Sequence, residues 1–252
     1  MTLRVFANGT VFADQQAGTG PLVVALHGWG RDRNDWGSAL DGRNALFVDL
    51  PGFGASPPPP SAWSAPEYAA CIAGVLEEHG DDGPRILLGH SFGGRVATCL
   101  AAARPDLVDG LLLCGVPLLR TDPSRKPALR FRVMRRLHRM HFVSDAAMER
   151  FRRSQGSADY RAAEGVMRDV LVRAVNETYE IELGQVMCPV AFLWGENDTA
   201  VPPAIAHAAA ALVANAVEVS VLPEVGHDAH QDERAELGRL IDVVGAESQP
   251  PP

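Results

Sequence analysis

The chain has 252 residues, of which 46% are hydrophobic and 21% are charged, so it is long enough to bury one substantial core. We expect one compact unit that carries an insertion. The formal charge of −8 and the pI near 5.5 argue against a nucleic-acid-binding protein, because such proteins need an excess of Lys and Arg. No signal-peptide pattern opens the chain and no stretch approaches the roughly 18 apolar residues of a membrane span, which predicts a cytoplasmic protein without membrane association.

Strands and helices alternate through most of the chain. Residues 3–14 contain two short β-forming runs joined by Asn8-Gly9, which predicts a β-hairpin. Apolar strands are expected at Leu22–Leu26, Ala45–Asp49, Ile86–Leu88, Leu111–Cys114, Val190–Trp194 and Val217–Leu222, most of them separated by helical segments such as Tyr68–His79 and Val96–Ala103. This alternation is typical of an α/β fold with a mostly parallel central sheet that helices cover on both faces.

The alternation stops between residues 117 and 185, where the sequence favours amphipathic helices. Leu129, Val133, Leu137 and Met140 recur at spacings of three or four. We therefore predict a helical cap at 117–185, inserted into a core made of residues 1–116 and 186–246. Residues 247–252 end in Gln-Pro-Pro-Pro and are expected to form a disordered tail.

The predicted cap is strongly basic. Residues 120–153 contain eleven Lys or Arg against three Asp or Glu, so this segment carries a charge of +8 and the remainder of the chain −16. Above an active site, such a segment would steer an anionic substrate or an acidic acyl carrier protein toward it. The alternative is a solvated helix face whose arginines pair with acids elsewhere on this acidic protein.

The four cysteines show no metal-binding or disulfide pattern. Cys71, Cys99, Cys114 and Cys188 are far apart, form no CxxC spacing and lie in apolar segments. We expect free, buried thiols.

Gly89-His90-Ser91-Phe92-Gly93 follows an apolar strand and precedes a helix-forming segment, which is the context of a nucleophile elbow. The glycines allow the tight turn that exposes a serine above the sheet, so Ser91 is the candidate nucleophile. The backbone N–H of Phe92, at the start of the helix, can point at a developing oxyanion. The alternative is a helix-capping serine in an ordinary turn.

A second glycine-rich loop, His27-Gly28-Trp29-Gly30, stands at the carboxyl end of the strand at 22–26, where open α/β sheets bind ligands. We expect the backbone N–H of Trp29 to be the second oxyanion donor. The side chains of Trp29 and Phe92 are candidates for substrate binding, with an ordinary core role as the alternative. His27 is expected to be structural, because another histidine fits the role of base better.

Two polar segments follow late strands. Gly195-Glu196-Asn197-Asp198 comes after the strand at 190–194, and Val225-Gly226-His227 comes after the strand at 217–222. A serine alcohol needs an imidazole to take its proton, and the imidazole needs a carboxylate to orient it. We predict Asp198 as the acid and His227 as the general base. The alternatives are Glu196 for the acid and Asp228 or His230 near the base.

Five motifs stand in order along the chain: LHGWG, DLPGFG, GHSFGG, WGENDTAVP and VGH. Together they resemble the α/β-hydrolase superfamily from Leu22 to the final helix. The resemblance implies the α/β-hydrolase fold, a triad in the order Ser91, Asp198, His227, two oxyanion donors, a cap between strands six and seven, and no cofactor. The first two motifs also look like the pimeloyl-carrier-protein methyl ester carboxylesterases of biotin synthesis, although His-Ser-Phe stands at the elbow where that group has Trp-Ser-Leu.

Serine at position 91 argues against the dehalogenases and epoxide hydrolases of this fold, which use an aspartate nucleophile. We therefore expect a hydrolase of small-molecule carboxylic esters or thioesters that acts through an acyl-enzyme. No metal site is expected, because no His/Cys/Asp cluster has ligand spacing. The alternatives are a cofactor-free haloperoxidase-like or lyase-like enzyme with the same triad, and a non-catalytic ligand receptor.

Overall fold

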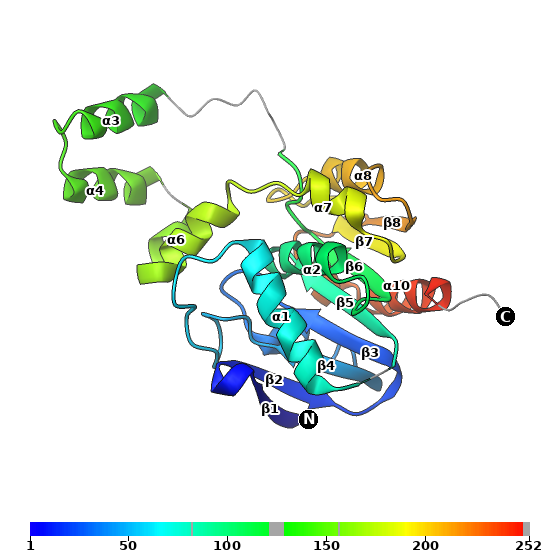
Figure 1. Cartoon of the computed structure of the whole chain (residues 1–252). Helices are drawn as coiled ribbons and strands as arrows, with labels where there is room; N and C mark the ends of the chain where they lie inside the picture. The colour runs from blue at the N-terminus through cyan, green and yellow to red at the C-terminus, as the bar shows by residue number, and fades with distance from the viewer. Residues whose placement is uncertain (82, 121–128, 156, 249–252) are drawn as a thin grey trace.

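The computed structural model describes residues 1–81, 83–120, 129–155 and 157–248, and its centre is an eight-stranded sheet (Figure 1). The strands follow the order β1-β2-β4-β3-β5-β6-β7-β8 across the sheet. Their bounds are β1 Thr2–Phe6, β2 Val11–Gln16, β3 Thr19–Leu26, β4 Arg43–Val48, β5 Arg85–His90, β6 Gly110–Cys114, β7 Val190–Gly195 and β8 Ala216–Leu222. All neighbours from β4 to β8 are parallel, and β2 pairs antiparallel with β1 and β4. The predicted α/β fold and the amino-terminal hairpin are confirmed.

Ten α-helices and two 3₁₀ turns connect the strands in the described residues. They are η1 Ala7–Gly9, η2 Arg33–Trp36, α1 Ala65–His79, α2 Phe92–Ala103, α3 Leu129–Arg139, α4 Asp145–Gln155, α5 Ala158–Ala162, α6 Gly165–Ala174, α7 Glu180–Gln185, α8 Ala204–Ala210, α9 Ala229–Asp232 and α10 Arg234–Glu247. Local sequence sets the ends of α1. Glu67 accepts from the backbone N–H of Ser64 at 2.6 Å in a capping box, and Gly80 ends the helix with φ 72°.

Helices cover both faces of the sheet, and each face buries its own apolar residues (Figure 1). Along β3, Leu22, Val24 and Leu26 belong to the core shared with α1 and α2, whereas Val23 and Ala25 belong to the core shared with α10. Side chains alternate between the faces of a strand, so a strand buried on both sides is apolar throughout. This explains why the inner strands are uninterrupted apolar runs.

The predicted cap segment consists of helices α3 to α7 in its described part, with no strand there. The later helices pack on the core: Val170 of α6 and Leu183 of α7 belong to the buried cluster shared with α1 and α2, and Arg95 of α2 donates to the carbonyl of Ala174. Helices α3 and α4 stand away from the sheet (Figure 1). Val133 on α3 and Met140, one residue beyond its end, are 47% and 50% exposed, so the predicted apolar stripe is only partly covered. The division into core and cap stays a prediction.

Helix α10 ends at Glu247, and its Val244 is buried against the sheet. The disordered tail at 247–252 stays a prediction. Residues 249–252 lie outside the described residues.

All four cysteines are free, as expected. Cys99 and Cys114 are buried, but Cys71 and Cys188 are partly exposed, so burial was predicted correctly for two of the four. Among the described helices, none combines the length and the apolar character that a membrane span requires.

Candidate active site

The turn around Ser91 has the strained geometry of a nucleophile elbow. Ser91 joins β5 to α2 with φ 48° and ψ −107°, a conformation that residues other than glycine rarely adopt. A Cβ on Gly89 would lie 2.4 Å from the Cα of Gly94, and a Cβ on Gly93 would lie 2.2 Å from the carbonyl oxygen of Leu26. Both positions therefore require glycine. Ser91 remains partly exposed at the carboxyl edge of the sheet.

Asp198 and His227 form a hydrogen bond, in which the Nδ1–H of the imidazole donates to the Oδ2 of the carboxylate at 2.7 Å. The Asp198 carboxylate is fully buried, and its other oxygen accepts from the backbone N–H groups of Ala200 at 2.9 Å and Val201 at 2.8 Å. The carboxylate is thus held with one oxygen directed at His227. With its proton on Nδ1, neutral His227 has a free lone pair on Nε2 that can accept a proton.

The alternative acid and bases are placed differently. The Glu196 side chain is exposed, on the loop that follows β7. His230 is 0% exposed and its ring packs edge-on against Trp36, with the ring centroids 4.8 Å apart. Asp228 forms a 2.6 Å salt bridge with Arg31. This arrangement favours Asp198 and His227 over all three alternatives.

His27 connects two loops and is not available as a base. Its Nδ1–H donates to the carbonyl of Gly28 at 2.7 Å, and its Nε2 accepts from the backbone N–H of Leu50 at 3.0 Å. Burial lowers the pKa of His27, so the ring stays neutral and both nitrogens stay engaged. Its own carbonyl accepts from the N–H of Gly93 at 3.1 Å. This bond ties the loop that carries Trp29 to the start of α2.

Trp29 and Phe92, the two expected oxyanion donors, are neighbours. Their rings meet edge to face with centroids 5.3 Å apart, and Phe92 meets Tyr68 in the same way at 5.1 Å. Phe53 completes the group 5.0 Å from Trp29. Sequence reasoning did not single out Phe53, although it belongs to the DLPGFG motif. The group forms an apolar, aromatic wall beside the elbow.

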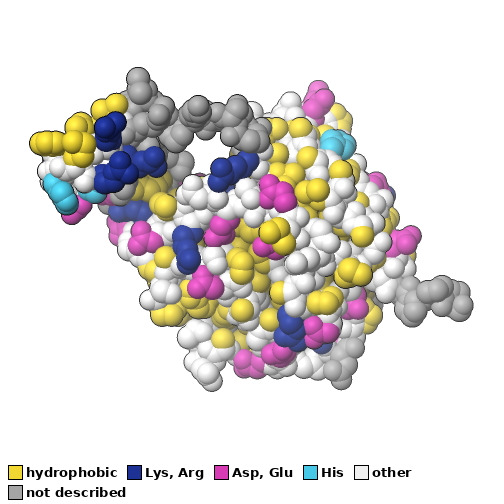
Figure 2. Space-filling view, turned by 45° about the horizontal axis from the view of Figure 1, so that its top comes forward, with side chains coloured by type: hydrophobic (Ala, Val, Ile, Leu, Met, Phe, Trp, Pro, Cys, Tyr) yellow, Lys and Arg dark blue, Asp and Glu magenta, His cyan; other side chains and the backbone are white. Residues whose placement is uncertain are grey.

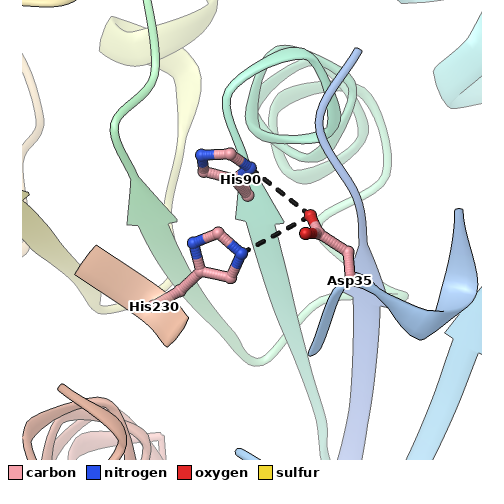
Figure 3. Close-up of side chains that lie close together, drawn as sticks. All are labelled: Asp35, His90 and His230. Carbon is pink, nitrogen blue, oxygen red and sulfur yellow. Dashed lines mark ion pairs between the residues drawn. The ribbon is translucent and has the colours of Figure 1, made fainter. Parts of the chain in front are cut away.

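Asp35, His90 and His230 form a buried polar cluster (Figure 3). Their nearest ligand-type atoms all lie within 4.8 Å of one another, and each residue is at most 8% exposed. Burial lowers the pKa of His90 to about 4, so this imidazole is neutral near pH 7. Carboxylate and imidazole are ligands that zinc accepts, but Arg31 already contacts the Asp35 carboxylate at 2.5 Å. A metal ion bound at this cluster would therefore lie close to the positively charged guanidinium of Arg31.

Sequence reasoning missed this cluster. It named His90 only as part of the elbow motif and His230 only as an alternative near the base, and it did not consider Asp35. The three residues are far apart in the chain, and Asp35 is one of several charges in the segment 31–35. No spacing rule separates an inward carboxylate in such a loop from a solvated one.

Comparison with known proteins identifies the family. The model of the alpha/beta hydrolase family matches residues 23–239. The chain belongs to this family. The resemblance inferred from the five motifs is thereby confirmed, and the sheet order and the position of the elbow agree with it.

The relatives include esterases. The chain is 28% identical over 239 residues to the biotin biosynthesis bifunctional protein BioHC of Cellvibrio japonicus, covering 87% of this chain and 46% of that protein. It is 35% identical over 109 residues to a pimeloyl-acyl-carrier-protein methyl ester esterase of Pseudoalteromonas atlantica, covering 41% and 40%. The chain therefore spans less than half the length of these two relatives. A solved esterase from Thermogutta terrifontis has the same fold, with TM-score 0.70, 21% identity and coverage of 99% and 100%.

Proposed function

We propose that this protein is a serine hydrolase of carboxylic esters or thioesters, with Ser91 as nucleophile, His227 as general base and Asp198 as the acid that orients it. The observation that carries this proposal is the 2.7 Å hydrogen bond between Asp198 and His227, together with the strained elbow at Ser91. The esterases among its relatives support a hydrolase acting on ester bonds.

Each step of the reaction has a residue in this arrangement. Ser91 Oγ attacks the carbonyl carbon while Nε2 of His227 takes the hydroxyl proton. The backbone N–H groups of Phe92 and Trp29 stabilise the negative oxygen of the tetrahedral intermediate, helped by the amino-terminal end of α2. The imidazolium returns its proton to the leaving alcohol or thiol. Water, activated by the same imidazole, then hydrolyses the acyl-enzyme and releases the acid.

A burst experiment tests the acyl-enzyme. Mixing the protein with a short-chain p-nitrophenyl ester should release close to one equivalent of p-nitrophenol per chain before the steady state, because acylation precedes a slower deacylation. A fluorophosphonate should label Ser91, as located by peptide mass spectrometry. A folded protein that gives neither signal would be a receptor rather than an enzyme, and labelling at another serine would exclude Ser91 as the nucleophile.

Metal chelation is expected to leave the hydrolysis rate unchanged. The proposed reaction uses no metal, and the Asp35 carboxylate in the one cluster found among the described residues already contacts Arg31. The measurement is kcat/KM for a p-nitrophenyl ester before and after dialysis against EDTA. A loss of activity that zinc or calcium restores would contradict the prediction.

The basic segment favours an anionic substrate or an acidic carrier protein as its partner. Arg135, Arg136 and Arg139 are exposed on α3, and none of them forms an ion pair with a described residue. Lys and Arg side chains gather on this part of the surface (Figure 2). Arg125 and Lys126 lie outside the described residues. Part of the basic run is thus free to attract a negative partner, as the steering hypothesis requires.

Salt dependence separates steering from a merely solvated helix face. We expect kcat/KM for an acyl-carrier-linked or carboxylate-bearing ester to fall about tenfold between low and high salt, while a neutral ester changes little. Charge reversal by Arg135→Glu with Arg136→Glu should lower the preference for the anionic ester. Equal salt responses for both esters, with an unchanged preference in the double variant, would leave α3 as an ordinary surface.

A further inference from the structure

The Asp35 carboxylate lies where three loops of the candidate active site meet. Asp35 belongs to η2, in the segment that follows the Trp29 loop. Its Oδ1 accepts from Arg31 at 2.5 Å and from the side-chain amide of Gln231 at 2.7 Å, and the same amide also donates to the backbone carbonyl of Asp35 at 2.8 Å. Gln231 follows His227 by four residues, so the loop of the base is attached directly to Asp35.

The second carboxylate oxygen faces the elbow and the Trp29 loop. Oδ2 lies 3.5 Å from Nδ1 of His90 and 3.4 Å from Nε2 of His230, and the backbone N–H of Gly28 donates to it at 3.5 Å. Figure 3 shows the carboxylate facing both imidazoles, with His90 coming from β5 and His230 from α9. One buried side chain therefore contacts the segments that hold Ser91, Trp29 and His227.

His90 extends these contacts to the two catalytic side chains. His90 directly precedes Ser91, and its Nε2 lies 3.3 Å from the carbonyl oxygen of His227. The centroids of the His90 and His227 rings are 4.9 Å apart. The His90 and His230 rings pack against each other, with their centroids 4.0 Å apart. A neutral imidazole has one N–H, and on Nε2 it donates to the carbonyl of His227 while Nδ1 faces the Asp35 carboxylate 3.5 Å away.

Arg31 adds two salt bridges that connect the Asp35 cluster to the His227 loop. Arg31 contacts Asp35 at 2.5 Å and Asp228 at 2.6 Å, so it bridges the loop after β3 and the loop that carries His227. These contacts bring no group of the cluster to the position where a substrate carbonyl would meet Ser91. The groups of the cluster that contact His227 and precede Ser91 are thus placed to hold other residues in position.

We propose that Asp35 is a positioning residue, which holds the Ser91 elbow and the His227 loop at their reactive separation through His90, His230 and Gln231. This role rests on the proposed function. The hydrogen-bond donors to this buried carboxylate belong to two separate segments, the loop after β3 and α9. Moving either segment would leave a buried polar group unpaired, so little displacement is tolerated. A misplacement of about 1 Å between reacting groups costs on the order of 100-fold in rate.

The test compares two buried aspartates. Asp35→Asn keeps the shape of the side chain but removes the negative charge that accepts from Arg31 and from the backbone N–H of Gly28. Asp49→Asn is the matched control, because Asp49 is also buried and pairs with an arginine. Its partner Arg33 belongs to η2, as Asp35 does, but neither Arg33 nor Ala55 belongs to the elbow or to the His227 loop, so the control separates a disturbed η2 from lost contacts to those two segments. Stopped-flow acylation by a p-nitrophenyl ester and the melting temperature are measured for both variants.

We expect acylation in Asp35→Asn to slow about 30- to 100-fold with the binding constant of the ester within about threefold of wild type. Fluorophosphonate labelling should slow by the same factor. Asp49→Asn should show a decrease in melting temperature similar to that of Asp35→Asn, and its acylation rate should stay within about threefold of wild type. Acylation in Asp35→Asn close to that of wild type, or equal losses in the two variants, would overturn the positioning role.

Gln231→Met provides a second variant that leaves no buried charge unpaired. It should slow acylation about fivefold to tenfold in the wild-type background and add little to Asp35→Asn, because both changes break the same contact. Full additivity of the two effects, or no effect of Gln231→Met, would overturn the proposal. The burst of the wild-type protein is measured in the same series. Its absence would reject the serine mechanism together with the positioning role. A normal burst with unaffected variants would reject the positioning role alone.

Discussion

Ser91→Ala and His227→Ala are each expected to lower kcat for ester hydrolysis about 10⁶-fold while the protein stays folded. The alanine at position 91 has no oxygen to form the acyl-enzyme, and without the imidazole the serine alcohol keeps its proton. Since the residues of a triad act as a unit, the double variant should be no worse than either single one. The measurement is the steady-state rate with a p-nitrophenyl ester, alongside the melting temperature.

His207→Ala is the matched control for the base. His207 lies exposed on α8, so removing its imidazole should leave kcat and the melting temperature near those of wild type. Near-normal turnover in Ser91→Ala would reject the whole mechanism. Near-normal turnover in His227→Ala alone would reject only the assignment of the base.

Asp198→Asn is expected to lower kcat on the order of 10⁴-fold. The Oδ2 of Asp198 accepts the Nδ1–H of His227, and this bond keeps the lone pair on Nε2. An amide nitrogen in that position donates instead, which favours the opposite tautomer and leaves Nε2 protonated. Asp198→Ala should give a loss of similar size, because the imidazolium then has no counter-charge.

Glu196→Ala is the control for the acid. Glu196 stands two residues before Asp198 on the same loop, but its side chain is exposed. We expect kcat within about threefold of wild type, since surface substitutions away from a site have small effects. A mild loss in Asp198→Ala with a severe loss in Glu196→Ala would assign the acid to Glu196.

The core elements were predictable because each has a local physical cause. The inner strands are short apolar runs since both faces of a parallel sheet are buried, and Gly89 and Gly93 mark the elbow since no Cβ fits there. The stripe on α3 shows the limit of such reasoning. Its spacing indicates a helix, but Val133 on α3 and Met140 just beyond its end remain about half exposed, because periodicity does not say what lies against the helix.

By itself, the sequence determined the order of the strands along the chain, the strained serine turn, and the polar loops at the carboxyl ends of β7 and β8. These follow from backbone sterics and from side-chain periodicity over a few residues. Only the tertiary structure decided that Asp198 rather than Glu196 meets His227, and that Asp35, His90 and His230 share one buried site. Such pairings depend on how loops from distant parts of the chain pack together, and the direction of a loop side chain has no local signature.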